Sequence, residues 1–206
     1  MSEPLRVGVL ASGRGSNFRA LAEAAASGRL GAAVVVLVTD RAGAGALAIA
    51  RELGVETVVI EPGQHPSREA HDKAVIAALE ERRVGLACLA GYMRLLSAGF
   101  VAHFAGRLLN IHPSLLPAFP GLHPQRQALE HGARVSGATV HFVDEGVDTG
   151  PIVLQAAVPV MPDDTEATLA ARILVEEHRL YPEAVRLFAR GRLEIHGRRV
   201  QIRETR

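Results

Sequence analysis

Residues 5–17 read Leu-Arg-Val-Gly-Val-Leu-Ala-Ser-Gly-Arg-Gly-Ser-Asn, an apolar run that leads into a loop with two glycines. The run Leu5–Ala11 has the composition of a strand that is buried on both faces of a sheet. The Ala-rich stretch Phe18–Ala26 is typical of a helix, and Gly28 ends it. This order of strand, glycine loop and helix predicts an α/β fold that begins with a parallel strand.

More apolar runs alternate with helical stretches along the first half of the chain. We expect strands over residues 33–39, 57–60, 84–90 and 107–111, and helices over residues 44–53 and 67–83, the second capped by Ser67 with Glu69 in its first turn. Wholly apolar strands that alternate with helices predict a Rossmann-like, doubly wound, mostly parallel sheet with helices on both faces.

The pattern changes after Pro117. We expect a helix over residues 125–131, antiparallel strands over 137–143 and 151–159, a helix over 166–189 that is interrupted near Tyr181-Pro182, and a short hairpin over 192–202. Neither a linker nor an internal repeat divides the sequence. We therefore expect one domain over residues 1–206, with antiparallel strands in its C-terminal half.

Composition excludes several classes of function. Of the 206 residues, 48% are hydrophobic and 22% charged, which is ordinary for a globular protein with a real core. Net charge is +1 and aromatics are only 4%, so neither nucleic acid nor an anionic membrane is an expected partner. The single cysteine, Cys88, rules out a disulfide framework and is expected to be a small buried side chain. With no leader pattern or membrane-length apolar run, we expect a cytoplasmic protein.

The glycine loop Ser12–Asn17 is a candidate anion site. Its glycines allow several backbone N–H groups to turn inward, and the start of the next helix adds the positive end of a dipole. Phe18 stands where a dinucleotide fingerprint has its third glycine, and no Gly-Lys-Ser/Thr follows as in a P-loop. The loop is therefore either a phosphate cradle or simply a tight strand–helix turn.

Residues 110–117, Asn-Ile-His-Pro-Ser-Leu-Leu-Pro, carry the strongest chemical signal. Asn110 and His112 are two residues apart at the end of a strand, so their side chains point to the same side. The prolines then prevent further regular structure and predict a stiff shelf. A carboxamide donor and a titratable ring suit a site that acts on a carbonyl group. Each residue taken alone could equally be a satisfied turn residue.

A carboxylate partner is expected from the loop between the two later strands. Asp148 lies between apolar Val147 and the start of the next strand, so it should be partly buried and need a cationic partner. We expect that partner to be His112, with the carboxylate raising the pKa of the imidazole. Asp144 and Glu145 fit a solvated turn better. The predicted catalytic set is therefore Asn110, His112 and Asp148, acting on an acyl carbon that a substrate amine attacks directly.

Residues Gly91–Leu96 follow the fourth expected strand. Ligands of parallel sheets bind outside the carboxyl ends of the strands, so Met93, Leu95 and Leu96 could line a slot for a flat heterocycle. The same residues could instead begin a helix with core side chains. The remaining histidines are scattered without the spacing of a metal site, and we expect no catalytic metal.

The chain as a whole resembles the glycinamide ribonucleotide formyltransferases of the folate-dependent formyltransferase family. The resemblance rests on Ser12–Asn17, Asn110–Pro117, Pro120–His123 and His141–Pro151, supported by Glu177-His178 with Tyr181-Pro182. It implies transfer of a formyl group from the co-substrate 10-formyltetrahydrofolate to the amine of glycinamide ribonucleotide, in purine biosynthesis. It also implies that residues 1–206 are a single formyltransferase domain, present as a monomer or homodimer, with small molecules as its partners.

The resemblance assigns roles to matched positions. It implies that Asn110, His112 and Asp148 are catalytic. The implied ribonucleotide contacts are Gly13, Arg14, Gly15, Ser16, Asn17, Arg68 and Glu177, and the implied folate contacts are Met93, Arg94, Leu95, Leu96, Asn110, Val143, Asp144 and Asp148. Arg14 and Gln125 depart from the pattern, since some members carry a small polar residue and a second histidine there.

Three alternative functions are compatible with the same residues. Hydrolysis of the formyl-folate would use the same trio, although such deformylases resemble this chain with an added N-terminal domain. Formyl transfer to methionyl-tRNA would call for a further C-terminal domain and a basic surface. A non-catalytic nucleotide-binding module would use the glycine loop alone.

Overall fold

The computed structural model describes residues 3–204, and the chain divides into two compact units, residues 1–109 and 110–206. The first unit contains four parallel strands in the order β3-β2-β1-β4. Its elements are β1 (Leu5–Leu10), α1 (Ser16–Ala26), β2 (Ala32–Thr39), α2 (Ala46–Glu52), β3 (Glu56–Val59), η1 (Pro62–Gln64), α3 (Arg68–Glu81), β4 (Leu86–Leu89) and α4 (Ala98–His103).

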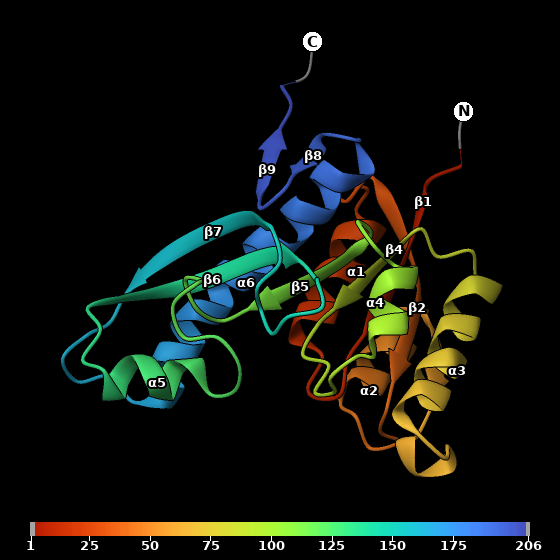
Figure 1. The fold of residues 1–206 in the computed structure, drawn as a ribbon, viewed down its shortest axis with the longest axis horizontal. Coiled ribbons are helices and arrows are strands. Elements are labelled where there is room, and N and C mark those ends of the chain that lie inside the picture. Colours follow the sequence, from red (N-terminus) through yellow and green to blue (C-terminus); the bar gives the residue numbers. More distant parts are fainter. Residues whose placement is uncertain (1–2, 205–206) are drawn as a thin grey trace. The chain divides into compact units, whose positions relative to one another are not determined.

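The strand order places helices on both faces of this sheet. The chain moves from β1 outward to β2 and β3, then returns past β1 to β4. Crossovers between parallel strands are right-handed, so α1 and α2 cover one face and α3 covers the other. Figure 1 shows these elements, from red β1 to yellow α3. The prediction of a doubly wound α/β fold is confirmed, and the switch point lies between β1 and β4.

The core of the first unit consists of aliphatic side chains on the central strands. Val7, Val9 and Leu10 of β1 are fully buried, as are Leu86 and Cys88 of β4. Strands that are buried on both faces contribute apolar area at about 25 cal/mol per Å² removed from water. Cys88 is thus the small buried side chain that the sequence predicted.

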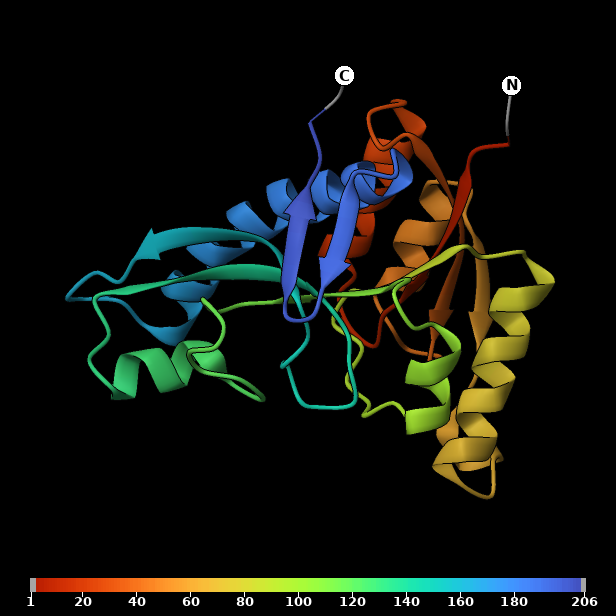
Figure 2. The same ribbon diagram turned by 45° about the horizontal axis from the view of Figure 1, so that its top comes forward.

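The second unit is built mainly on antiparallel pairing, as predicted. Its strands run in the order β5-β6-β7-β9-β8, with β6 and β7 antiparallel, β7 and β9 parallel, and β8 and β9 antiparallel. The elements are β5 (Leu108–His112), α5 (Pro124–Glu130), β6 (Val135–Phe142), β7 (Ile152–Pro159), α6 (Glu166–Ala189), β8 (Leu193–His196) and β9 (Arg199–Ile202). Figure 2 shows the hairpin β8–β9 in blue beside the end of α6.

The predicted break in the last helix is wrong. Helix α6 runs unbroken from Glu166 to Ala189 with Pro182 inside it. Proline removes one backbone hydrogen bond and strains the turn before it. The neighbours of Pro182 compensate, because Tyr181, Ala184 and Val185 are fully buried and α6 packs against β6 and β7. Burial of that face outweighs the lost bond.

The positions at which α3 and α4 begin bear on function. Helix α3 begins after Ser67, whose hydroxyl accepts a hydrogen bond from Ala70 N at 3.1 Å, as the sequence predicted. Residues Tyr92–Leu96 form a loop, and the following helix α4 begins only at Ala98. The alternative in which a helix begins within residues 91–96 is therefore wrong, and helix α4 itself was not predicted.

Gly15 provides a test of this packing. Its φ is +80°, and an added Cβ would lie 2.6 Å from Ala46 Cβ and 2.7 Å from its Cα, whereas a Cβ on Gly13 would meet nothing within 4 Å. We predict that Gly15→Ala lowers the free energy of unfolding by about 1–3 kcal/mol, through backbone strain and overpacking. Gly13→Ala, the matched control, should change it by less than about 0.5 kcal/mol. Equal effects of the two substitutions in urea unfolding would contradict the account.

Candidate functional site

The strand end β5 carries the predicted carboxamide and imidazole. Asn110 is half-buried and His112 buried, and the two-residue spacing turns both side chains to one side of β5. Asp148 reaches them from the loop between β6 and β7, with φ of +53°, a left-handed conformation that aspartate tolerates better than most residues.

The three side chains meet around the Asp148 carboxylate. His112 Nδ1 lies 3.3 Å from Asp148 Oδ2, and Asn110 Nδ2 donates to Asp148 Oδ1 at 3.5 Å. Gly121 N donates to Oδ2 at 2.8 Å, which fixes the orientation of the carboxylate. The structure thus brings together the three residues that the sequence singled out, all of them within the second unit.

A fourth polar side chain, His141, was not predicted to belong to this set. His141 Nδ1 lies 2.8 Å from Phe142 O, a carbonyl that can only accept, so Nδ1 carries the proton of the neutral ring. His141 Nε2 is then an acceptor for Asn110 Nδ2 at 3.1 Å, and it lies 3.6 Å from Asp148 Oδ1. His141 thereby orients the carboxamide. A histidine within a strand is usually predicted to be a core residue. The place of His141 beside Asn110 follows from the pairing of β6 with β5, which the sequence alone does not show.

The shelf after β5, which the sequence predicted to be stiff, makes hydrogen bonds to β6 and β7. Thr139 Oγ1 donates to Ser114 O at 2.7 Å and accepts from Leu116 N at 3.1 Å. Gln155 Nε2 donates to Leu116 O at 2.8 Å, and the Leu116–Pro117 peptide bond is cis. These contacts tie the shelf to β6 and β7, and they hold His112 at a fixed place.

His112 lies between two acceptors. Its Nε2 lies 2.9 Å from Phe119 O, and its Nδ1 faces the Asp148 carboxylate. Burial lowers the pKa of His112; the Phe119 carbonyl and the Asp148 charge oppose this effect only in part. The carboxylate acts to raise this pKa, as predicted, but burial is the larger contribution and the net shift is downward.

The pKa of Asp148 is shifted in the sense expected of a hydrogen-bonded carboxylate. Burial acts to raise this pKa, but the polar contact with His141, the hydrogen bond from the Gly121 backbone and the nearby His112 ring lower it overall. At neutral pH the carboxylate is ionised and the His112 ring holds one proton. Two acceptors then share a single imidazole proton, so the ring is arranged to take up a second.

The other residues predicted to contact the substrates differ in their burial and in their partners. Asp144 Oδ1 accepts from Thr149 Oγ1 at 2.6 Å and from Gly146 N at 3.1 Å, so this predicted folate contact also closes its own loop. Val143 is half-buried at the end of β6. Glu177 of α6 is buried, 7% exposed, whereas Arg68, in the first unit, is half-exposed and lies 3.4 Å from Glu69.

The glycine loop of the first unit has the form of an anion cradle. Gly15 occupies the N-cap position of α1 in a left-handed conformation, and no side chain caps the helix. Gly13 and Arg14 are exposed, and Ser16 and Asn17 are half-buried in the first turn. Uncapped N–H groups at the start of an 11-residue helix can bind an anion such as a phosphate.

The loop after β4 presents apolar side chains to solvent. Met93 is 60% exposed and Leu95 68% exposed, while Arg94 and Leu96 are half-buried. Exposed apolar side chains on a loop at the carboxyl end of a parallel strand suit a bound flat ligand.

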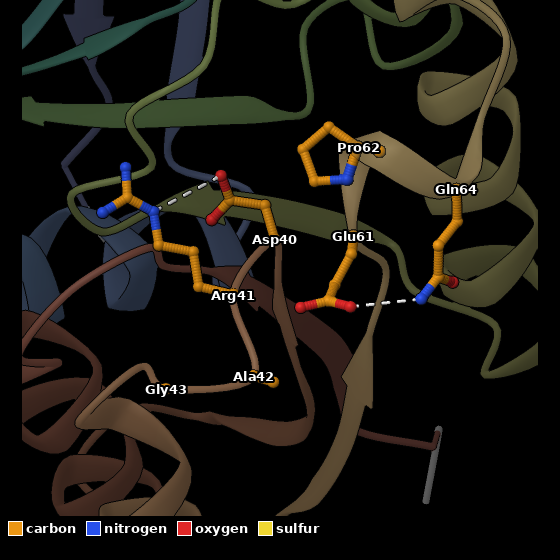
Figure 3. A pocket seen from close by; sticks show the side chains of 8 residues that line it. Asp40, Arg41, Ala42, Gly43, Glu61, Pro62 and Gln64 are labelled. Atoms are coloured by element: carbon orange, nitrogen blue, oxygen red, sulfur yellow. Dashed lines mark hydrogen bonds and ion pairs between the residues drawn. The ribbon is translucent and has the colours of Figure 1, made fainter.

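Figure 3 shows a different hollow, of about 640 Å³, at the carboxyl ends of β2 and β3. Asp40 and Glu61 contribute carboxylates to it, but these face Arg41 at 4.0 Å and Gln64 at 3.1 Å rather than an imidazole. It contains none of the predicted site residues. Within residues 3–204 no group of three His, Cys, Asp or Glu side chains is arranged to hold a metal ion.

The chain is similar to known proteins over most of its length. Residues 5–185 match the family described as formyl transferase. Phosphoribosylglycinamide formyltransferase of Escherichia coli is 44% identical over 192 residues, which cover 93% of this chain and 91% of that protein. The crystal structure of glycinamide ribonucleotide transformylase 1 from Symbiobacterium toebii is 54% identical, with a TM-score of 0.97 over 99% of this chain and 96% of that chain.

Longer proteins also contain a similar segment. The trifunctional purine biosynthetic protein adenosine-3 of Drosophila pseudoobscura pseudoobscura is 50% identical over 196 residues, or 94% of this chain. The chain spans only 14% of the length of that relative. The similarity therefore concerns one segment of the trifunctional protein.

The pKa shifts predict how acid affects stability. Because the pKa of His112 is lower in the folded protein, this group stabilises the fold above its ordinary pKa of about 6.5 and loses that effect as the pH falls below it. We predict that the wild type loses more stability than His112→Gln between pH 7.5 and 5.5, by at most about 1.4 kcal/mol. The pKa of Asp148 is lowered from 3.8, so protonation of this carboxylate reduces stability only below this pH window.

Urea unfolding at the two pH values measures this difference. His131→Gln, at an exposed position, is the matched control and should keep the pH dependence of the wild type. A His112→Gln variant that loses as much stability in acid as the wild type would contradict the assignment.

Proposed function

The chain belongs to the formyl transferase family, and from that premise we propose that it transfers a formyl group from 10-formyltetrahydrofolate to the amine of glycinamide ribonucleotide. The acceptor is that named for the Escherichia coli relative, which is similar over nearly its whole length. The observation that carries the proposal is the meeting of Asn110, His112 and Asp148 at the end of β5.

In the proposed reaction the amine attacks the formyl carbon directly. A bond forms between that carbon and the amine nitrogen, the bond from the carbon to folate N10 breaks, and one amine proton ends on N10. The carboxamide of Asn110, oriented by His141, exchanges its long 3.5 Å contact with Asp148 for a hydrogen bond to the carbonyl oxygen as that oxygen becomes an oxyanion. Loss of one such donor raises a barrier by about 3–4 kcal/mol in a known case.

In the proposed reaction His112 holds the transferred proton, and Asp148 stabilises the charged ring that results. The neutral ring of His112 has room for a second proton, because Phe119 O and Asp148 Oδ2 both accept. A proton that leaves the attacking amine can be held there and returned to the leaving nitrogen. The ionised Asp148 stabilises the imidazolium while it lasts, and the Gly121 N–H keeps that carboxylate in place.

The two substrates are assigned to the surfaces that the sequence predicted. We propose that the ribonucleotide contacts Gly13–Asn17, Arg68 and Glu177, with its phosphate at the uncapped start of α1. We propose that the folate contacts Met93–Leu96, Val143 and Asp144, with Asn110 and Asp148 near its reactive end. The exposed apolar side chains of Met93 and Leu95 support a flat heterocycle there.

Three other predictions accompany this function. A single formyltransferase domain over residues 1–206, a cytoplasmic location and a monomeric or homodimeric state each stay a prediction. Among residues 3–204, no helix is long and apolar enough to span a bilayer.

An assay of products separates the proposed function from its alternatives. The purified protein is incubated with formyl-folate, with and without glycinamide ribonucleotide, and deformylated folate and formylated ribonucleotide are both quantified. We predict that they appear in equal amounts and only when the ribonucleotide is present. If deformylated folate forms without the ribonucleotide, the protein is a hydrolase instead. If neither mixture gives product, the result favours a non-catalytic nucleotide-binding module.

Substitutions in the trio should lower turnover rather than binding. We predict that His112→Ala and Asp148→Asn reduce kcat about 10²- to 10⁴-fold, with a much smaller change in KM for either substrate, because their interactions strengthen in the transition state. Asp163→Asn, an exposed carboxylate in the second unit, is the matched control and should keep normal kinetics. Near-normal kcat in both trio variants, measured at saturating substrates, would overturn the role assignment.

A further inference from the structure

Ser12 connects the glycine loop to the loop after β4. It is 3% exposed and lies two residues after the end of β1. Its backbone N–H donates to Gly91 O at 3.1 Å, and its Oγ accepts from Met93 N at 2.9 Å. These bonds continue the β1–β4 pairing, whose last register pair is Leu10 with Leu89, beyond both strand ends.

The glycine loop is held from its other side as well. Gly13 O accepts from Ala46 N at 3.1 Å, where α2 begins, and Gly15 packs so closely on Ala46 that a Cβ would lie 2.6 Å from the alanine Cβ. These contacts oppose a movement of the loop toward α2, and on its other side Ser12 connects the loop to Gly91 and Met93.

The loop after β4 is anchored at its far end too. Asp72 of α3 is 2% exposed, and its Oδ2 accepts from Ser97 N at 2.6 Å. The buried His71 ring beside it contacts Ile60 O at 2.9 Å. Residues Met93–Leu96 therefore lie between two attachment points. Ser97 is held by Asp72 at one end, and Met93 is held by Ser12 at the other.

From these contacts we propose that Ser12 is a positioning residue that couples the two substrate sites, so that a ribonucleotide bound at the glycine loop strengthens the binding of folate. The inference rests on the proposed function, which places the phosphate at Gly13–Asn17 and the heterocycle at Met93–Leu96. A bound phosphate orders the glycine loop, and the two Ser12 bonds then order Met93 before the folate arrives. The second ligand loses less conformational entropy, and by linkage the effect is reciprocal.

The coupling is measured as a ratio of dissociation constants. A folate analogue without a transferable formyl group is titrated into the full-length protein by calorimetry, with and without saturating glycinamide ribonucleotide. Coupled sites typically change each other's affinity about 5- to 150-fold. We predict that the ribonucleotide tightens the analogue at least about fivefold in the wild type and less than about twofold in Ser12→Ala.

Ser97→Ala is the matched control. Ser97 is also a buried serine, 6% exposed, on the same loop, and its Oγ caps α4 by accepting from Phe100 N at 3.3 Å. It should lose stability as a cap deletion does but keep the coupling of the wild type. Loss of coupling in both variants would mean that general loosening of the loop, not the Ser12 link, is responsible, and would overturn the proposal.

The outcomes separate this proposal from the function on which it rests. Binding of both ligands with unchanged coupling in Ser12→Ala, or with no coupling in the wild type, overturns the role of Ser12 and leaves the function standing. Absence of binding by either ligand to the wild type overturns the proposed function itself. If Ser12→Ala does not fold, hydrogen exchange of the wild-type Met93 amide decides: it must slow at least about fivefold when the ribonucleotide alone is added.

Discussion

The orientation of the Asp148 carboxylate is the constraint on which the proposed chemistry depends. One oxygen accepts from Gly121 N–H and faces His112, and the other accepts from Asn110. A buried carboxylate is tolerated only where such donors surround it. The donors come from two segments, β5 and the loop after it, and the carboxylate itself comes from the β6–β7 loop. The carboxylate can therefore keep its place only if all three are correctly folded. Stability and chemistry therefore depend on the same few contacts.

The first unit contributes backbone geometry rather than reactive side chains. Its central strands, β1 and β4, are largely buried, and the groups proposed to bind ligands are N–H and C=O groups at their carboxyl ends. Gly15 provides the left-handed turn that opens the start of α1, and Ser12 links this turn to the loop that displays Met93. A parallel sheet with a switch point beside β1 gives such loops a common edge, which suits two ligands that must react with each other.

Residue patterns predicted the fold and the trio because these depend on local signals. Apolar runs predicted the strands, and the prolines after His112 predicted that regular structure ends there. What the patterns missed depends on burial and on distant pairing. Pro182 signals a break, but the packing of α6 overrides it. His141 belongs beside Asn110 only because β6 pairs with β5. The lowered pKa of His112 reflects burial that a sequence does not display.

The central claim is that Asp148 and His112 form one electrostatic unit at the reacting carbon. The most direct test is the titration of the His112 ring, followed through its nitrogen chemical shifts in labelled wild type and in Asp148→Asn. The account predicts a midpoint below the ordinary value of about 6.5 in the wild type, and a lower one still in the variant, because the stabilising charge is gone while burial remains. A midpoint that does not move, or that rises when the carboxylate is removed, would contradict it.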